Sequence, residues 1–297
     1  MLVVDNAPSD DTTARVVAGY PVSYLCEPQP GLNWARARAI RHAKTEVVLF
    51  TDDDVVVDPG WIDAMRAPFS DAQVGAVTGL ALPLELETEA QRMFEDYGGF
   101  SRGFRRLEFA APETPPAASG RVGAGASMAF RRSLAEELSL FEVELDCGTA
   151  TRSGGDTYAF YRLLRRGLRI VYTPDAIVWH RHRREMKQLR SALGGYSTGV
   201  YAFLLRCLQD HRDLSALDVG WRWFYGHHLA HLWRALRGGD GALPLSLVLA
   251  EIGGCLAAPY AHVVSRRRER SIRHRRQPAR PRRPDEEGPE WREEGNA

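Results

Sequence analysis

Short apolar runs alternate with amphipathic segments along the first half of the chain. The strand-length runs are Leu2–Val4, Val22–Cys26, Glu46–Phe50 and Val74–Leu80, and the helix-length segments are Gly31–Ala43 and Trp61–Phe69. A short apolar run bounded by turn residues is typical of a buried strand, and strands that alternate with helices are typical of βα units. The pattern therefore predicts an α/β fold built on a largely parallel sheet.

The second half changes from strands to helices. Gly123–Arg131 has the pattern of a strand entered by glycines, and Leu168–Tyr172 and Ala176–His180 that of two strands around a Thr-Pro-Asp turn. Gly154–Arg166 has a helical apolar face, and apolar residues recur with a helical period from Glu185 to Leu208. We therefore expect the sheet to end near residue 184.

The C-terminal third is apolar first and basic afterwards. Residues 241–264 contain one charged residue, Glu251, and an Arg-rich stretch follows. The apolar segment is interrupted by Pro244, Glu251, Gly253, Gly254 and Pro259. We therefore expect a re-entrant or interfacial helical pair rather than a span, with a soluble helical subdomain as the alternative. The predicted domains are an α/β domain at 1–184, a helical, optionally membrane-associated region at 185–264, and a disordered Arg/Pro/Glu-rich tail at 265–297.

Composition narrows the class of protein. The chain has 297 residues, 44% of them hydrophobic, which excludes a collagenous or wholly disordered protein. Lys and Arg number 39 against 38 Asp and Glu, so a net charge of +1 argues against nucleic acid as a partner. The four cysteines show no CxxC spacing, and no secretory signal is evident. We expect a cytoplasmic protein, whose basic tail could bring it to an anionic membrane surface.

The strongest local signal is the sequence VVLFTDDD, in which a predicted strand ends in carboxylates. Open α/β sheets bind ligands at the carboxyl ends of their strands. Asp52 and Asp54 lie on alternate sides of an extended chain and could hold a divalent cation and a ribose together. The alternative is a solvated acidic turn.

Two further segments carry candidate chemistry. Asp156 follows two glycines at the start of a helix, where it could act as a general base or only cap the helix. His180 or His182, at the end of the last predicted strand, could complete a metal shell or be an ordinary surface histidine. Gly123 and Gly125 could let the backbone approach a ligand closely or merely interrupt a strand.

Taken in order, five stretches resemble the inverting family 2 glycosyltransferases of the GT-A fold. They are VVDNAPSDDT, GLNWARARAI, VVLFTDDDVVVDPGWI, GAGASMAFRR and GGDTYAFYRLLRRGLRIVYTPDAIVWHRHRR, within residues 1–184. The resemblance implies a GT-A-type (Rossmann-like) mixed, mainly parallel sheet flanked by helices, followed by a helical C-terminal region. It also implies transfer of a sugar, with inversion, from a UDP-, dTDP- or GDP-linked donor. The acceptor would be a glycan, a lipid-linked or a small-molecule hydroxyl, in a setting such as cell-envelope polysaccharide synthesis.

The resemblance also assigns roles to residues. Asp5 and Arg36 would lie beside the donor nucleotide, and Asp52 to Asp54 match the DxD motif that holds ribose and Mg²⁺ or Mn²⁺. Asp52 and Asp53 would also contact the nucleotide, with Asp52, Asp54 and His180 on the metal. Asp156 matches the catalytic base. The residues expected near the donor sugar or the acceptor are Gly123, Gly125, Ser127, Gly155, Trp179 and His182.

The sequence departs from the family pattern in ways that keep alternatives open. The family's first strand and helix would precede Leu2, Gly155 stands where an acid is common, and Ala37 and Ser127 stand where asparagine is common. One alternative is a non-catalytic, membrane-associated binding or scaffold paralogue that lacks the first βα unit. The other is a metal-dependent phosphoesterase that uses the DDD and HRH segments. The expected location is the cytoplasm, or the cytoplasmic face of the membrane as a peripheral or anchored protein.

Overall fold

The computed structural model describes residues 1–238 and 241–276. Its strands are β1 Leu2–Asn6, β2 Ser23–Glu27, β3 Val47–Thr51, β4 Val55–Val57, β5 Val74–Pro83, β6 Leu107–Phe109, β7 Ser127–Arg131 and β8 Arg169–His180. Its α-helices are α1 Thr12–Val17, α2 Leu32–His42, α3 Trp61–Arg66, α4 Glu89–Tyr97, α5 Arg132–Glu137, α6 Gly155–Arg165, α7 Met186–His211, α8 Ser215–Trp223, α9 Ala230–Arg237 and α10 Leu245–Arg276. The 3₁₀ turns η1 Ala67–Ser70 and η2 Pro116–Arg121 and the π-helical turn η3 Phe224–Leu229 complete the elements.

The strands form a mixed sheet and a separate pair. The larger sheet has the order β3-β7-β5-β8-β4, with β6 also on β8, and β1 pairs with β2 alone. The pairings β1–β2 and β5–β8 are parallel, whereas β3–β7, β5–β7, β4–β8 and β6–β8 are antiparallel. The α/β prediction is confirmed, but a mainly parallel sheet is wrong. The main reason is that β7 runs antiparallel to both of its neighbours, β3 and β5, and that β4 and β6 both run antiparallel to β8.

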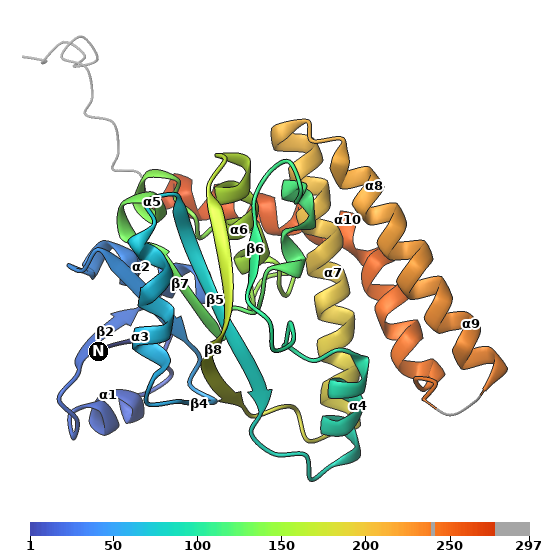
Figure 1. Cartoon of the computed structure of the whole chain (residues 1–297), viewed down its shortest axis with the longest axis horizontal. Coiled ribbons are helices and arrows are strands. Elements are labelled where there is room, and N and C mark those ends of the chain that lie inside the picture. The colour runs from blue at the N-terminus through green and yellow to red at the C-terminus, as the bar shows by residue number, and fades with distance from the viewer. Residues whose placement is uncertain (239–240, 277–297) are drawn as a thin grey trace, which may run out of the picture.

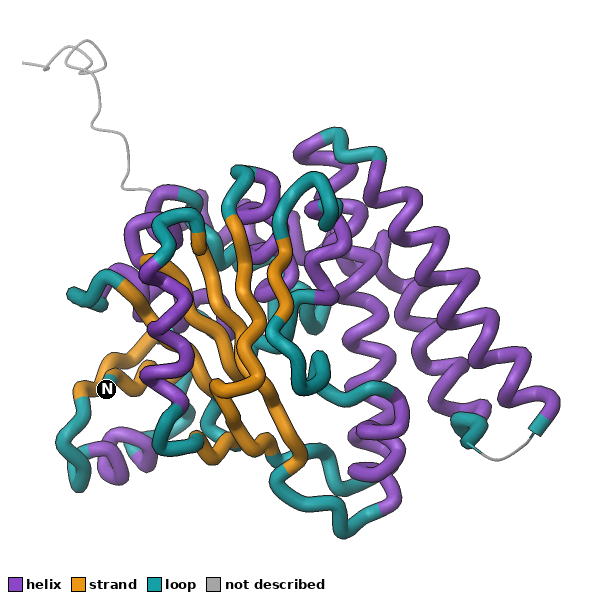
Figure 2. The backbone as a smooth tube through the Cα atoms, in the orientation of Figure 1, coloured by secondary structure: helices purple, strands orange, loops and turns teal. Residues whose placement is uncertain are grey.

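Helices cover both faces of the large sheet (Figures 1 and 2). Side chains alternate along the central strands: Met128 and Phe130 pack in a cluster with α6, while Ala129 packs in a cluster with Trp61 and Met65 of α3. This alternation is the period-two pattern of a strand buried on both sides. The central strands are thereby buried on both faces, and the residues that follow the strand ends remain available to form a site.

The last strand is longer than predicted. Leu168–Tyr172 and Ala176–His180 belong to one strand, β8, whose register against β5 shifts between Gly79 and Leu80. A side chain at Gly79 would overlap the carbonyl oxygen of Ala176, so the glycine lets the irregular Thr-Pro-Asp segment pack against β5. The predicted strand at Gly123–Arg131 is shorter, because β7 begins only at Ser127.

The C-terminal helices pack beside the sheet domain (Figure 1). The helix predicted at Glu185–Leu208 is confirmed as α7. The helical pair predicted at 241–264 is wrong, since α10 is one helix that continues through Pro259. A side chain at Gly254 would overlap the carbonyl oxygen of Gly194 in α7, so this glycine serves close helix packing rather than a break. The disordered tail predicted from residue 265 is wrong as far as Arg276, and its remainder lies outside the described residues.

Candidate active site

The acidic turn lies where the sequence predicts it, at the end of β3. Asp52 follows this strand directly, and β4 starts just after Asp54. Val55 pairs with His180 in the register of β4 against β8, and this pairing brings His180 beside Asp54, with Nε2 3.4 Å from Oδ1. Ligand atoms of Asp52, Asp54 and His180 all lie within 4.8 Å of one another. The predicted metal-binding residues are therefore brought together.

The donor set suits a divalent cation. Two carboxylates and one imidazole are ligands that Mn²⁺ accepts, and carboxylates are those that Mg²⁺ prefers. The Asp52 side chain is 33% exposed and that of Asp54 is 43% exposed, so both can be reached from solvent. Burial lowers the pKa of His180, which favours the neutral imidazole that binds metals.

The second histidine of the segment has a different position. His182 is buried, with Nε2 2.7 Å from Oε1 of Glu95 and Nδ1 3.2 Å from Nδ1 of His180. It therefore supports the ring of His180 from behind, and His180 is the histidine that faces the carboxylates. No sequence signal pointed to Glu95, which is one acid among several on the amphipathic helix α4.

Arg36 is the buried cation of the site. It comes from α2, and its Nη2 lies 3.9 Å from Oδ1 of Asp52 while Nη1 donates to Oδ1 of Asn33 at 3.4 Å. Burial raises the pKa of Asp52, and the positive charge of Arg36 opposes that rise. Arg36 thus lies beside the DxD turn, as the prediction of a donor-binding residue requires.

Asp156 approaches the same place from α6. The N-cap of this helix is Gly154, with a φ of 103°, so Asp156 lies in the first turn and the capping alternative is wrong. Its Oδ2 accepts the backbone N–H of Gly125 at 3.0 Å, and its Oδ1 accepts the N–H of Thr157 at 2.8 Å. A Cβ on Gly125 would lie 2.9 Å from both Arg36 Nη2 and Asp156 Oδ2. The base candidate and the buried cation therefore meet across Gly125.

The remaining predicted residues differ in what they contact. A side chain at Gly155 would overlap the Asn33 amide, which explains why no acid occupies this position. Gly123 packs on Thr78, since a Cβ there would lie 2.6 Å from it. Trp179 pairs with Val56 in the sheet.

Ser127, which we expect near the donor sugar or the acceptor, is a buried residue, and its role there stays a prediction. Its side chain is fully buried in the sheet, where its Oγ lies 2.9 Å from the indole Nε1 of Trp61 and accepts that N–H. Ser127 is the first residue of β7 and pairs with Thr51, the residue directly before Asp52, so its backbone lies beside the acidic turn while its side chain packs in the core.

Asp5 and Asp53 lie at the margin of the arrangement. Asp5, in β1, accepts a hydrogen bond from the hydroxyl of Tyr24 at 2.9 Å. Among the described residues, no hydrogen bond or ion pair joins it to Asp52 or Arg36, so its role beside the nucleotide stays a prediction. Asp53 is exposed in the turn between its two neighbours.

Asp146 is a residue that the sequence did not reveal. It is buried, and its Oδ2 accepts the backbone N–H of Asn33 at 2.7 Å, beneath the start of α2. Burial raises its pKa to about 7. It belongs to an irregular segment without a motif, so only the folded chain places it beside Arg36 and the site.

Part of this chain is similar in sequence to known proteins. Two proteins from strains of Mycobacterium tuberculosis, both called pre-mycofactocin glycosyltransferase, are 28% identical over 171 residues, which is 57% of this chain and 34% of theirs. The chain thus spans about a third of the length of these curated relatives.

Solved structures resemble the fold more distantly. GalNAc-T7 with UDP, GalNAc and Mn²⁺ has a TM-score of 0.45 at 17% identity, over 68% of this chain and 41% of that one. Glucosyl-3-phosphoglycerate synthase from Mycobacterium tuberculosis, with Mn²⁺, UDP and phosphoglyceric acid, has a TM-score of 0.42 at 16% identity, over 67% and 66%.

The family comparison covers the sheet domain and the start of α7. Residues 1–194 match the glycosyltransferase like family 2, and they include the acidic turn, Arg36, Asp156 and His180. The ordered motifs and the site built from them agree with this match. The chain belongs to glycosyltransferase family 2.

Proposed function

We propose that this chain transfers a glycosyl group from a nucleotide-diphosphate sugar to an acceptor hydroxyl, with inversion at the anomeric carbon. The observation that carries the proposal is the convergence of Asp52, Asp54 and His180 with Arg36 and Asp156 at one end of the sheet. These groups come from four separate parts of the sequence (α2, the acidic turn, α6 and the end of β8), which a solvated acidic turn would not require. The proposal also agrees with the family to which the chain belongs.

Asp52, Asp54 and His180 would hold Mg²⁺ or Mn²⁺ at the donor diphosphate. Such a cation, when bound, neutralises the negative charge that develops on the departing diphosphate. Arg36 supplies a fixed positive charge beside Asp52, in a buried position where water screens it little. The protein therefore presents both an ion site and its own cation to an anionic donor.

Asp156 acts as the general base. It takes the proton of the acceptor hydroxyl as the acceptor oxygen attacks the anomeric carbon and the bond to the diphosphate oxygen breaks. Both carboxylate oxygens already accept backbone N–H groups, from Gly125 and Thr157, and these bonds fix the direction of the carboxylate. Each oxygen keeps a further lone pair for the proton it receives.

Substitution of Asp156 by Asn tests this assignment. We expect Mn²⁺-dependent nucleotide binding to persist while the transfer rate falls by about 10²–10⁴-fold, the usual contribution of a general base. The matched control is Asp63→Asn, an exposed acid in the first turn of α3, which should change neither quantity. A transfer rate equal to that of the unaltered chain would refute the role of Asp156. Loss of nucleotide binding would make Asp156 a donor ligand instead.

The identities of the acceptor and of the donor nucleotide base stay predictions, and the two alternative functions make different predictions for the unaltered chain. The non-catalytic alternative predicts that no nucleotide sugar is turned over by the unaltered chain, even where a nucleoside diphosphate binds. The phosphoesterase alternative predicts hydrolysis of phosphodiesters without any sugar donor. Nuclear magnetic resonance of the anomeric proton, before and after transfer, tests inversion directly.

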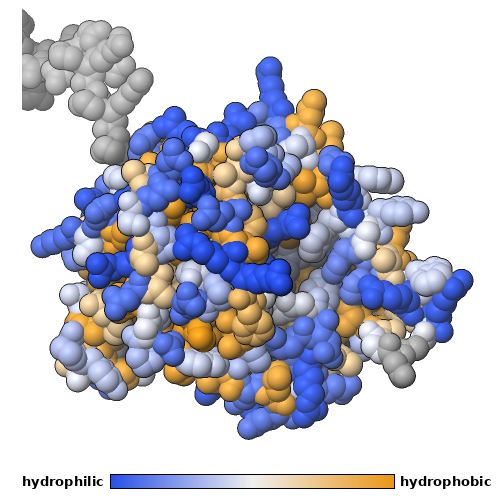
Figure 3. Space-filling view, in the orientation of Figure 1, coloured by the Kyte–Doolittle hydropathy of each residue, from blue (hydrophilic) through white to orange (hydrophobic). Residues whose placement is uncertain are grey.

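We also propose that the chain works as a peripheral protein at the cytoplasmic face of a membrane. Within the described chain, Leu245–Ile272 is the one helical segment long and apolar enough to cross a membrane by length and composition. Exposed aromatic rings occur on the neighbouring helical segment, including Trp221 at 66% and Trp233 at 55%. Of the most apolar window of Leu245–Ile272, 39% is buried inside the protein, so this helix also packs against its neighbours, and apolar and charged residues are interspersed over the face seen in Figure 3.

Vesicle sedimentation tests this location. The chain should sediment with vesicles that contain anionic lipid, and the exchange of Trp221 and Trp233 for Ser should reduce that binding by about tenfold or more. Equal recovery in the supernatant with and without vesicles would contradict the proposal. Release only by detergent, with high salt and alkaline wash ineffective, would indicate a spanning helix.

A further inference from the structure

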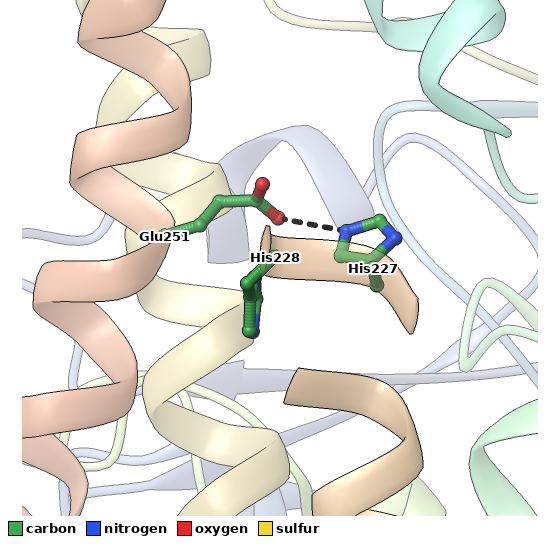
Figure 4. Close-up of side chains that lie close together, drawn as sticks. All are labelled: His227, His228 and Glu251. Carbon is green, nitrogen blue, oxygen red and sulfur yellow. Dashed lines mark hydrogen bonds and ion pairs between the residues drawn. The ribbon is translucent and has the colours of Figure 1, made fainter. Parts of the chain in front are cut away.

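A second group of metal-binding side chains lies among the C-terminal helices, apart from the acidic turn. His227 and His228 belong to the π-helical turn η3, and Glu251 belongs to α10. One ligand atom from each lies within 4.8 Å of the others. Figure 4 shows Glu251 reaching from α10 toward the two histidines, with a dashed line to His227.

Glu251 is a buried carboxylate that pairs with no Lys or Arg side chain in the described part of the chain. Its exposure is 1%, and in the described part of the chain its only ion-pair partner is His227, whose Nε2 lies 3.4 Å from Oε1. The hydroxyl of Tyr97, in α4, also donates to Oε1, whereas Oε2 has no hydrogen-bond partner among the residues that the structure describes. Buried carboxylates are normally paired with a cation or bound to a metal, so a cation bound at Glu251 would stabilise its buried carboxylate.

The two histidines also have contacts that suit metal ligands. His228 is fully buried, with Nε2 3.4 Å from Oγ of Ser197, and within residues 1–238 and 241–276 its Nδ1 has no hydrogen-bond partner. His227 Nε2 lies 2.9 Å from the Tyr97 hydroxyl. Ligands about 2.0–2.1 Å from a tetrahedral zinc ion are about 3.4 Å apart, the separation found between His227 and Glu251. Two buried atoms, Oε2 of Glu251 and Nδ1 of His228, are thus available as ligands beside a pair of atoms already at the separation that zinc requires.

We propose that His227, His228 and Glu251 bind one Zn²⁺ or similar transition-metal ion that fastens η3 and α10 to each other. Two imidazoles and one carboxylate favour zinc over Mg²⁺ or Ca²⁺, which prefer oxygen ligands. Tyr97 holds the carboxylate by its hydrogen bond, in the way that partners behind metal ligands do. π-Helical turns are rare and are frequent at functional sites, which agrees with two adjacent histidines placed on η3.

The ion would link the helical layer to the donor site. Tyr97 ends α4, and Glu95 of the same helix contacts His182, the histidine behind His180. An ion at Glu251 would therefore hold the helix that orients the donor-site imidazole. This site is separate from the acidic turn, and its existence does not depend on the proposed transfer reaction.

Metal binding by the untagged full-length chain tests the proposal. The Asp54→Ala variant removes a ligand of the donor site, and after EDTA treatment it is titrated with Zn²⁺ and with Co²⁺, whose tetrahedral complexes absorb strongly in visible light. We expect about one ion per chain with tetrahedral Co²⁺ bands. Absence of stoichiometric binding in this variant would overturn the proposal. Metal binding only in chains that keep Asp54 would likewise overturn it and assign the metal to the donor site.

Second substitutions in the same Asp54→Ala chain locate the ion. Glu251→Gln and His228→Gln should each weaken binding of Zn²⁺ by more than about 100-fold, because even partners behind ligands contribute up to that factor. His262→Gln alters another buried histidine of α10, one that contacts Gln209, and should leave binding unchanged. The His227 side chain is 18% exposed, so His227→Gln is the substitute variant if circular dichroism shows that Glu251→Gln and His228→Gln do not fold. Unaltered binding in the folded Glu251 or His227 variant would refute the site.

Discussion

Gly125→Ala is the sharpest perturbation that the site offers. The glycine does not have a positive φ, so its backbone accepts alanine without strain. The added Cβ, however, would lie 2.9 Å from Nη2 of Arg36 and 2.9 Å from Oδ2 of Asp156, where ordinary contact begins at 3.4 Å. Each of these functional atoms must therefore move by 0.5 Å, and the hydrogen bond from the Gly125 N–H to Asp156 must distort.

We expect Gly125→Ala to lower the transfer rate more than it lowers the stability of the fold. The displaced atoms are the ends of side chains rather than backbone, so we expect a loss of about 1 kcal/mol or less in the free energy of unfolding, a fall of roughly 2–4 °C in Tm. A misplacement of about 1 Å can lower a rate by about 10²-fold, so a shift of half that size should lower transfer by about 10–100-fold, or about 1.4–2.7 kcal/mol.

The assay is release of nucleoside diphosphate from the nucleotide sugar that the chain binds, measured with and without acceptor. Gly120→Ala is the matched control, because its Cβ would lie 3.8 Å from the nearest atom, Cγ2 of Thr157. A Gly125→Ala chain that is folded and transfers within about threefold of the unaltered rate would refute the reasoning, since the positions of Arg36 and Asp156 would then not matter.

Three further predictions test other parts of the structure. Arg206→Met should lower the free energy of unfolding by about 3–5 kcal/mol in urea titrations, because it leaves the buried Glu144 with only the more distant guanidinium of Arg266, at 4.0 Å, in the described part of the chain; a loss below about 1 kcal/mol would contradict this. Asp146→Asn should remove a pH dependence: the raised pKa of about 7 means that the folded chain keeps a proton the unfolded chain loses, so the stability of the unaltered chain relative to the variant should fall from about pH 4 to about pH 7 and then stay level. A difference that does not vary with pH would refute it. Gly254→Ala should destabilise by about 1–3 kcal/mol through overlap with Gly194. Gly253→Ala, where no atom of the described residues lies within 4 Å of the added Cβ, should stabilise by about 0.5–1 kcal/mol. Equal changes in Tm for the two variants would contradict close packing of α10 on α7.

Sequence patterns predicted the features that depend on neighbouring residues. The apolar run before Asp52 specifies a strand, which is half-buried at the edge of the sheet, and the change to polar residues specifies where it ends. The period of apolar residues specifies α7 over almost its whole length. His180 was predicted as a metal ligand only as one of two candidates, because residues two apart in sequence share a strand face and cannot be separated by pattern alone.

Features that depend on distant pairing were not predictable. The antiparallel entry of β7 between β3 and β5 depends on long-range register, which no local pattern encodes. Gly254 was interpreted as a helix breaker, since its contact with Gly194 requires the crossing of α7 and α10 to be known. Asp146 and Glu95 reach the site from segments without a motif, and Glu251 meets His227 across separate helices. In each case the partner lies far away in sequence.

The most direct test of the central claim is a thermal-shift titration with UDP, GDP and dTDP, each with and without Mn²⁺, on the unaltered chain and on Asp54→Ala. A ligand present at about 100 times its Kd should stabilise the chain by about 2.7 kcal/mol. The account predicts that one of these nucleotides raises Tm only together with Mn²⁺, and that Asp54→Ala abolishes the shift, since Asp54 shares the ion site with Asp52 and His180. A Mn²⁺-dependent shift that persists in Asp54→Ala, or no shift with any of the three nucleotides, would contradict the assignment of the donor site.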